Sequence, residues 1–268
     1  MNRVREYRKE DIPELVRLWA ECFEGPERFA EKFFTMLPDF GSCVIMENEE
    51  GKVIAMASVI AGHELQFGGS IKKPVCGYIY GVAVEKACRG KGYGKEISKA
   101  AYELAKKRES MIVALNPASP ELFGFYETSL GMHPVLYREK HSVPAGDVEM
   151  TMKLSTTEYN LMREEFLRGK TFLRLSFFAT DFLRVLCEDF GGGLYASMSG
   201  ICACTAEDGV CTVYEVLSQD PVATAASAAH ALGCREAVYY LPSEHGEPFI
   251  ASDSDKIPAD TIWNITYE

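Results

Sequence analysis

The sequence predicts an α/β protein built on a mixed β-sheet, with two units in succession along its 268 residues. Short β-branched and aromatic runs alternate with helix-length amphipathic segments, which is typical of strands interleaved with helices. The second half repeats the core order of the first, namely two helices, a hairpin, a strand, a helix and a strand. A chain of this length can bury two cores. We therefore expect a first domain over residues 1–154 and a second domain over residues 155–268.

The first domain is expected to open with a strand, two helices and three further strands. Val4 to Tyr7 has strand composition, and Ile12-Pro13 is a typical helix start. Pro26 begins a second helix, whose phenylalanines we expect in the core. The strands that follow are predicted over residues 42–46, 52–61 and 77–84.

A basic glycine loop joins the last of these strands to the next helix. Its residues, in order, are Arg89, Gly90, Lys91, Gly92, Tyr93, Gly94 and Lys95. The first N–H groups of a helix lack intrahelical partners and lie at the positive end of the helix dipole, so they suit a phosphate group. Glycine lets the backbone approach the anion, and Arg89 and Lys91 add positive charge. The stretch therefore predicts a pyrophosphate site.

Two better-known phosphate loops do not fit this stretch. A nucleoside-triphosphate loop requires Ser or Thr after Gly-Lys, but Gly94-Lys95 is followed by Glu96. The dinucleotide fingerprint requires Gly-x-Gly-x-x-Gly, but the pair Gly90 and Gly92 is followed by a lysine at the third position. Both signatures fail at a residue that their chemistry needs.

The loop resembles the coenzyme A site of the GNAT superfamily of N-acetyltransferases, whose signature is Arg or Gln, two residues, Gly, one residue, then Gly or Ala. Arg89, Gly92 and Gly94 match it position for position. The resemblance implies acetyl-CoA as co-substrate, with its pantetheine arm along the preceding strand. The coenzyme-binding residues that it implies are Val82, Ala83, Val84, Arg89, Gly90, Lys91, Gly92, Tyr93, Gly94 and Lys95. A glycine-rich turn without a ligand is the alternative.

A second motif lies after the next predicted strand. The helix of residues 122–132, with its aromatic pair Phe125-Tyr126, resembles the second GNAT motif. The resemblance implies that Tyr126 protonates the leaving thiolate of the coenzyme and that Asn116 reaches the pantetheine amides. A phenol has a higher ordinary pKa than a thiol, so it can assist this departure by hydrogen bonding. A tyrosine that only packs, and an asparagine that only forms a turn, are the alternatives.

Two strands, over residues 134–138 and 149–154, are expected to close the first domain. Thr156 and Thr157 then cap a helix, which places the boundary near residue 155. In the second half, Asp220-Pro221 stands where the glycine loop would be. An aspartate at the N-cap fills the anion position itself. We expect a degenerate GNAT-like repeat without a coenzyme site, with an unrelated α/β lobe as the alternative.

This two-unit organisation resembles the enhanced-intracellular-survival group of acetyltransferases, which pair an active GNAT domain with a degenerate one. The run Leu-Asn-Pro-Ala at residues 115–118 supports the resemblance. Members of the group use the terminal carboxylate as a base, which implies Glu268 here. Tyr80, acting through water, and Glu47 are the other candidate bases.

Composition argues against several other classes of protein. A net charge of −11 is unlike that of a nucleic-acid binder. The nine cysteines are scattered without a Cys-x-x-Cys pair, so neither a disulfide framework nor a metal site is expected. No apolar run reaches membrane-spanning length and the N-terminus is charged, so we expect a cytoplasmic protein that does not bind membranes. The sequence leaves the oligomeric state open and allows a homo-oligomer.

The charge is divided unevenly between the two halves. Residues 1–154 carry 21 Lys/Arg and 22 Asp/Glu, a net −1, whereas residues 155–268 carry 7 and 17, a net −10. An acidic half favours a cationic acceptor, although acidity also serves solubility. We expect acetyl transfer to a primary amine of a small cationic molecule. The alternatives are an enzyme that acetylates protein lysines or N-termini, a non-catalytic acyl-CoA sensor and a protein-interaction module.

Overall fold

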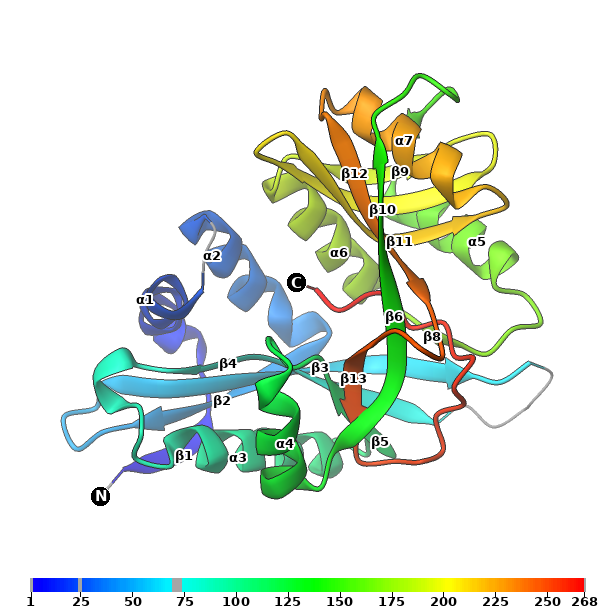
Figure 1. Cartoon of the computed structure of the whole chain (residues 1–268). Coiled ribbons are helices and arrows are strands. Elements are labelled where there is room, and N and C mark those ends of the chain that lie inside the picture. The colour runs from blue at the N-terminus through cyan, green and yellow to red at the C-terminus, as the bar shows by residue number, and fades with distance from the viewer. Residues whose placement is uncertain (1, 24–25, 69–73, 268) are drawn as a thin grey trace. The chain divides into compact units, whose positions relative to one another are not determined.

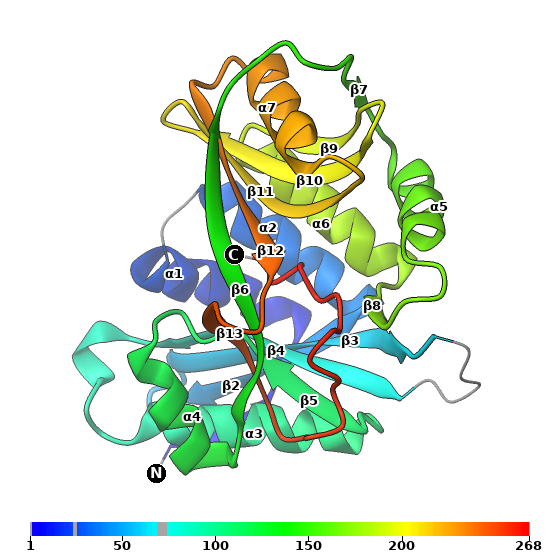
Figure 2. The same ribbon diagram turned by 45° about the vertical axis from the view of Figure 1, so that its right-hand side comes forward.

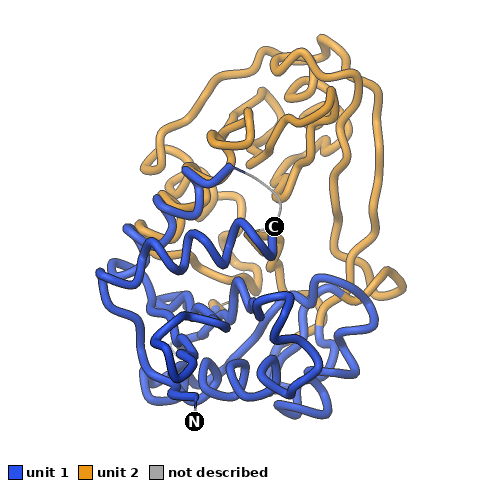
Figure 3. Tube along the Cα trace, turned by 90° about the vertical axis from the view of Figure 1, so that its left-hand side faces the viewer, with its two compact units in different colours: residues 1–65, 73–135, 249–257 blue, residues 66–72, 136–248, 258–268 orange. Residues whose placement is uncertain are grey.

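The computed structural model of the chain (Figure 1 and Figure 2) describes residues 2–23, 26–68 and 74–267. Contacts divide it into two compact units (Figure 3). Unit 1 comprises residues 1–65, 73–135 and 249–257, and unit 2 comprises residues 66–72, 136–248 and 258–268. This division differs from a single boundary near residue 155, because each unit contains a strand from the other half of the sequence.

Unit 1 is a mixed sheet with helices on both faces. Its strands lie in the order β1-β2-β3-β4-β5-β13. β4 and β5 are parallel, and the other neighbouring strands pair antiparallel among the described residues. Helices α1 and α2 cover one face, and α3 and α4 cover the other (Figure 1). The elements are β1 Arg3–Glu6, α1 Ile12–Cys22, α2 Glu27–Met36, β2 Gly41–Glu47, β3 Val53–Gln66, β4 Val75–Val84, α3 Tyr93–Lys107, β5 Ile112–Leu115, α4 Glu121–Leu130 and β13 Glu247–Ser252.

The apolar stripes of these helices form the core of unit 1. The phenylalanines of α2 are buried, as the sequence predicts, and pack around Trp19 of α1. The Trp19 ring centroid lies 5.5 Å from that of Phe33 and 5.7 Å from that of Tyr80. On the opposite face, Ile97, Ala101 and Leu104 of α3 join a second buried cluster with residues of β2 to β5 and α4.

Polar contacts hold β13 beside β5. Ala251 pairs with Leu115, and the Ser252 hydroxyl donates to the Val113 carbonyl at 3.0 Å. Asp253 accepts from the Val113 N–H at 2.8 Å and from the Tyr102 hydroxyl at 3.0 Å. The Lys106 ammonium also contacts this carboxylate, at 2.6 Å, so charged and neutral donors together make the attachment specific. The last strand of the unit 1 sheet therefore comes from near the end of the chain.

Unit 2 repeats this architecture. Its strands lie in the order β6-β12-β11-β10-β9-β7, with β11 and β12 parallel. Helix α7 covers one face, and α5 and α6 cover the other (Figure 2). The elements are β6 His133–Pro144, β7 Met152–Lys153, α5 Thr156–Phe166, β8 Phe172–Arg174, α6 Phe177–Asp189, β9 Gly193–Ala196, β10 Gly200–Glu207, β11 Val210–Ser218, α7 Pro221–Ala231 and β12 Glu236–Pro242.

Strands β6 and β13 each lie in the unit formed mainly by the other half of the sequence, which sequence patterns did not predict. The strand after α4 was expected to close the first domain, but β6 runs on to Pro144 and pairs with β12 of unit 2. The strand predicted over residues 149–154 is reduced to β7, which pairs with β9 of unit 2. Beside β5 lies β13 instead. An alternating pattern identifies a strand but carries no information on its partner.

Smaller corrections concern the ends of elements. Ser155, not Thr156 or Thr157, is the N-cap of α5, and its side chain accepts from the Glu158 N–H. Residues 194–205, whose composition indicates one continuous strand, form parts of two strands, because the chain turns between β9 and β10. These shifts fall at boundaries, where caps and turns decide the last residue.

A buried ion pair lies at the centre of unit 2. The Arg163 guanidinium of α5 donates to the Glu215 carboxylate of β11 from Nε at 2.8 Å and from Nη2 at 3.1 Å. The Tyr159 hydroxyl donates to the same carboxylate at 2.8 Å, and Arg163 Nη1 donates to the Leu173 carbonyl at 2.8 Å. The carboxylate is fully buried and the guanidinium nearly so, and these bonds offset their desolvation.

Replacing Glu215 by alanine is expected to lower the free energy of unfolding by about 3–5 kcal/mol, because Arg163 would remain buried without its carboxylate. Urea unfolding followed by circular dichroism measures the change. The control is Glu165→Ala, which removes the exposed partner of Arg168 and should leave the midpoint nearly unchanged. Equal effects of the two substitutions would contradict this account of the core.

Candidate coenzyme site

The glycine loop of unit 1 has the open geometry that an anion site requires. Gly90 and Gly92 adopt φ of +77° and +83°, a conformation that favours glycine. A Cβ built on either residue would meet no atom within 4 Å, so the space in front of the loop is empty of protein. The loop follows a short 3₁₀ turn over Lys86–Cys88 and passes directly into α3.

The N-terminus of α3 is available to a ligand. Gly92 is its N-cap, and no side chain of the described residues caps it. The corresponding helix of unit 2 differs, because the Asp220 side chain accepts from the Ala223 N–H at 3.0 Å and Pro221 occupies the first turn. An uncapped helix start offers N–H groups and the positive end of the dipole to an anion, whereas a capped one does not. The contrast expected between the two halves is therefore present in their geometry.

The cationic side chains at the loop differ in their surroundings. Arg89, Lys91 and Lys95 are all exposed. Arg89 Nε donates to the Val84 carbonyl at 3.1 Å, and its Nη2 lies 3.7 Å from the Cys22 sulfur. Arg89 therefore turns back to the end of β4 and fixes the start of the loop. Lys91 and Lys95 add positive charge at the loop surface.

The strands β4 and β5 stop pairing before the loop. Their last pair among the described residues is Tyr78 with Ala114, and β4 continues to Val84. A β-bulge falls in this extension, because Met56 pairs with Ala83 but Ser58 pairs with Tyr80. Bulges commonly occur beside functional sites, where they redirect the strand.

Gly81 lies within this bulge, with φ of +61°. A Cβ built on it would lie 2.8 Å from the Trp19 ring, so only glycine fits beneath that ring. Val82, Ala83 and Val84 follow, beyond the part of β4 that β5 covers. The three residues that the family resemblance implies for the pantetheine arm therefore lie on a strand segment whose β5 side carries no strand pairing.

Tyr126 lies close to this segment and to the loop. It belongs to the buried cluster of α3 and α4, against which Val82 and Val84 also pack. A Cβ built on Gly94 would lie 3.8 Å from the Phe125 ring, so the aromatic pair of α4 lies beside the first turn of α3. Among the described residues, the Tyr126 hydroxyl has no hydrogen-bond partner, and burial raises its pKa to about 12. A buried neutral phenol can donate a proton to an incoming group.

Asn116 and Glu268 complete the residues expected at the site. Asn116 directly follows β5 and is partly buried. The carboxyl ends of the parallel strands β4 and β5 face the same edge of the sheet, so Asn116 and Val84 lie toward that edge. Glu268, the candidate base, lies outside the described residues.

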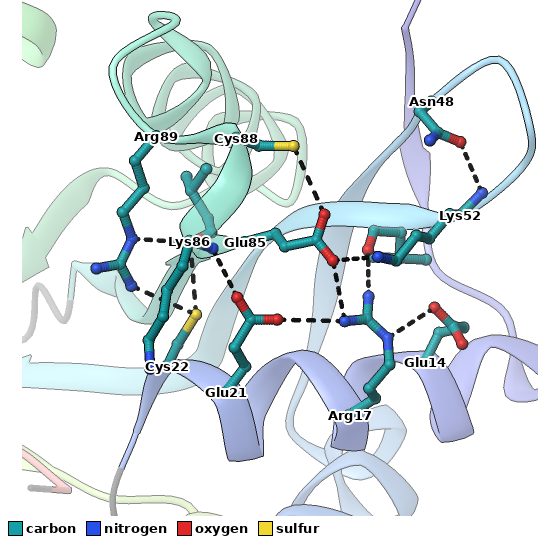
Figure 4. A network of polar contacts seen from close by, with 12 residues as sticks. Glu14, Arg17, Glu21, Cys22, Asn48, Lys52, Glu85, Lys86, Cys88 and Arg89 are labelled. Atoms are coloured by element: carbon teal, nitrogen blue, oxygen red, sulfur yellow. Dashed lines mark hydrogen bonds and ion pairs between the residues drawn. The ribbon is translucent and has the colours of Figure 1, made fainter.

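A charged network beneath the loop was not identified from the sequence. Glu85, the first residue after β4, contacts Lys52 and accepts from Arg17 Nη1 at 3.2 Å (Figure 4). Glu21 accepts from the Lys86 N–H at 2.6 Å. From the sequence, only the position of Glu85 between the strand and the loop could have indicated this network. Its partners Arg17 and Lys52 lie far away in the chain.

Over residues 2–23, 26–68 and 74–267, no three His, Cys, Asp or Glu side chains converge in a way that could hold a metal ion. No helix in the same ranges is both long and apolar enough to cross a membrane.

A family model matches the first part of the chain. Residues 3–129 match the model described as an acetyltransferase (GNAT) domain. The sequence matches no curated protein.

Solved structures similar in fold cover nearly the whole chain. A GCN5-related N-acetyltransferase from Kribbella flavida aligns over 94% of this chain and 71% of its own, with 18% identity and a TM-score of 0.64. A probable N-acyltransferase from Enterococcus faecalis aligns over 94% and 72%, with 13% identity and a TM-score of 0.69. Eis1 from Mycobacterium abscessus aligns over 93% and 73%, with 9% identity and a TM-score of 0.60. These likenesses concern the fold, and they extend over both units.

Replacing Gly92 by aspartate is expected to lower the affinity for coenzyme A at least about a hundredfold, because it puts a carboxylate where the anion would bind. Isothermal titration measures the affinity. Gly233→Asp is the matched control, since Gly233 also has a positive φ of +68° and open space around its Cα. If both variants bind coenzyme A like the unaltered protein, the loop is not the anion site.

Proposed function

We propose that the GNAT acetyltransferase domain of residues 3–129 moves an acetyl group from acetyl-CoA to a primary amine of a small cationic acceptor. One observation carries the proposal. The uncapped start of α3, the end of β4 that β5 does not cover and the side chain of the buried Tyr126 lie together in unit 1. An anion site, a strand edge and a proton donor are the parts that a thioester donor with a pyrophosphate group requires.

In the proposed complex, the pyrophosphate binds the backbone of Gly90 to Gly94, with Lys91 and Lys95 adding charge. The pantetheine arm runs along Val82 to Val84, and Asn116 contacts its amides. Backbone N–H groups are the natural partners of pantetheine amides, because an extended chain can pair with a free strand edge. The acetyl group then lies near the bulge at Gly81 and near Tyr126.

The reaction is a direct transfer between two bound substrates. The neutral amine nitrogen attacks the thioester carbonyl carbon, a C–N bond forms, and the carbonyl oxygen becomes an oxyanion that β4 N–H groups stabilise. When the oxyanion collapses, the C–S bond breaks and the thiolate takes a proton from Tyr126. The amine loses one proton to the base before the attack and a second proton after it, and this second proton restores the phenol of Tyr126. Alignment of amine and thioester contributes on the order of 7–11 kcal/mol to lowering the barrier.

The amine needs a proton acceptor, for which the sequence offers Glu47, Tyr80 and Glu268. Glu47 is a poor candidate, because it is engaged by the Arg5 guanidinium at the edge of the sheet. Tyr80 packs its ring against Trp19 and Phe33, although it remains partly exposed. We retain the carboxylate of Glu268 as the proposed base, on the resemblance to the enhanced-intracellular-survival group.

The acceptor class is proposed from charge. Residues 155–268 carry 7 Lys/Arg against 17 Asp/Glu, and an excess of negative charge raises the local concentration of cations. We propose that this half shapes the acceptor site, in a two-domain arrangement of the type that the fold likeness to Eis1 supports. Protein lysine and N-terminal amines are the alternative acceptors. Steering by charge requires that kcat/KM for polyamines fall with added salt more steeply than that for neutral amines.

A non-catalytic acyl-CoA sensor is the second candidate, since it would use the same loop. The partner-free hydroxyl of Tyr126 favours the enzyme, because binding alone does not require a proton donor. The discriminating experiment incubates the protein with acetyl-CoA and a panel of polyamines, aminoglycosides and lysine peptides. Thiol release that depends on an amine supports the enzyme. Tight binding of acetyl-CoA without thiol release would show a sensor.

Tyr126→Phe is expected to lower kcat about a hundredfold with little change in the affinity for acetyl-CoA. Burial raises the Tyr126 pKa to about 12, so the hydroxyl stays protonated through pH 10 and the loss should be the same at pH 7 and pH 9. Steady-state thiol release at both pH values measures it. Tyr102→Phe is the control, because that hydroxyl donates to Asp253. An unchanged kcat for Tyr126→Phe would remove this residue from the mechanism.

A further inference from the structure

The charged network below the glycine loop joins three separate segments of unit 1. Arg17 comes from α1, Lys52 from the turn before β3, and Glu85 from the residue that follows β4 (Figure 4). Arg17 Nη1 donates to Glu85 at 3.2 Å, and its Nη2 donates to the Val53 carbonyl at 2.7 Å. Lys52 contacts the same Glu85 carboxylate. The carboxylate is therefore held by two cations that are themselves attached to other elements.

Glu85 is fixed through its backbone as well as its side chain. Its N–H donates to the Ile54 carbonyl at 2.9 Å, and its carbonyl accepts from the Cys88 N–H at 2.8 Å. The residue is only 8% exposed, which is unusual for a glutamate at the end of a surface strand. Lys52, the strongest contributor, and Arg17 hold the Glu85 pKa below its ordinary value. The ion pair is thus intact at neutral pH.

A second contact holds the next residue. Glu21 of α1 accepts from the Lys86 N–H at 2.6 Å, and Arg17 Nη1 also donates to Glu21 at 3.4 Å. Arg17 therefore holds two carboxylates, and both of them fix the 3₁₀ turn of residues 86–88 from which the loop begins. Its Nε donates to Glu14 at 3.1 Å, so all three guanidinium nitrogens are engaged.

The loop itself lacks comparable support. A Cβ built on Gly90 or Gly92 would meet no atom within 4 Å, and both residues are exposed. Glycine also has the greatest conformational freedom to lose on binding. The path of the loop is consequently determined by its two ends, namely α3 on one side and the network on the other. Preorganising such a segment improves affinity by reducing the ordering cost of binding.

We propose that Arg17 and Glu85 are positioning residues for the donor, which hold the pyrophosphate loop in its binding conformation without touching the coenzyme. The inference rests on the proposed function, since it assigns the loop to the pyrophosphate of acetyl-CoA. Neither residue is a direct anion ligand, because Arg17 is occupied by its acidic partners and Glu85 would repel a phosphate. Their effect should therefore depend on whether the donor contains a pyrophosphate.

The test compares two donors with Arg17→Met and Glu85→Gln. Acetyl-CoA carries the pyrophosphate, whereas S-acetylpantetheine ends before it. We expect KM for acetyl-CoA to rise about tenfold to a hundredfold with little change in kcat, and kcat/KM for S-acetylpantetheine to stay within about twofold. Arg17→Lys should recover part of the loss, because one ammonium can satisfy only part of the fork.

Arg184→Met is the matched control. Arg184 also pairs with two acidic residues of its own helix and is 28% exposed against 33% for Arg17, but it lies on α6 of unit 2. Arg184→Met should leave KM and kcat for acetyl-CoA, and kcat/KM for S-acetylpantetheine, unchanged. Equal losses of the Arg17 and Glu85 variants with both donors would show general damage, and an unchanged KM for acetyl-CoA would show that the network has no role. Both results overturn the proposal.

Failure of the proposed function would be distinguishable from failure of this inference. Titration of the unaltered protein with coenzyme A measures binding at the loop directly, without turnover. If the unaltered protein does not bind coenzyme A, the assignment of the loop is wrong. If it binds and the two variants bind equally well, with unchanged thermal midpoints, the loop assignment stands and the positioning role is refuted.

Discussion

The constraint on which unit 1 depends is the parallel pairing of β4 and β5. Two neighbouring parallel strands need a crossover connection, and here that connection is the glycine loop and α3. The crossover returns the chain over the sheet, so the N-terminus of α3 lies beside the end of β4. Because the pairing ends after Tyr78 while β4 continues to Val84, the uncovered edge of β4 lies near the start of α3. The position of the proposed donor site therefore follows from the strand topology. The side chains around it add positive charge and a proton donor.

Unit 2 shows that the topology alone does not make a coenzyme site. It has the same parallel pair, the same crossover helix and a bulge at Tyr214 in β11 that corresponds to the bulge at Gly81. Yet Asp220 caps α7, and Glu215 after the bulge forms a buried pair with Arg163. The helix start that receives an anion in the proposed unit 1 site is capped by a side chain of the chain itself in unit 2. This supports its description as a degenerate repeat.

The site was more predictable from the sequence than the assembly of the sheets. The loop, the strand before it and the helix of Tyr126 depend on local signals, namely glycines with positive φ, helix caps and apolar periodicity. The exchange of β6 and β13 was not predictable, since β13 pairs with a strand more than a hundred residues away. The ion pair of Arg17 and Glu85 spans 68 residues and has no local signature. The tertiary structure decides which residues pair at such a separation in the sequence.

The central claim is that one chain has one donor site, in unit 1. Isothermal titration of the purified protein with coenzyme A, at known protein concentration, tests it most directly. A single donor site in unit 1 predicts a stoichiometry of one coenzyme per chain. Two equivalents per chain would contradict it, because the capped start of α7 would then bind a pyrophosphate as well. No binding at all would contradict the assignment of the glycine loop.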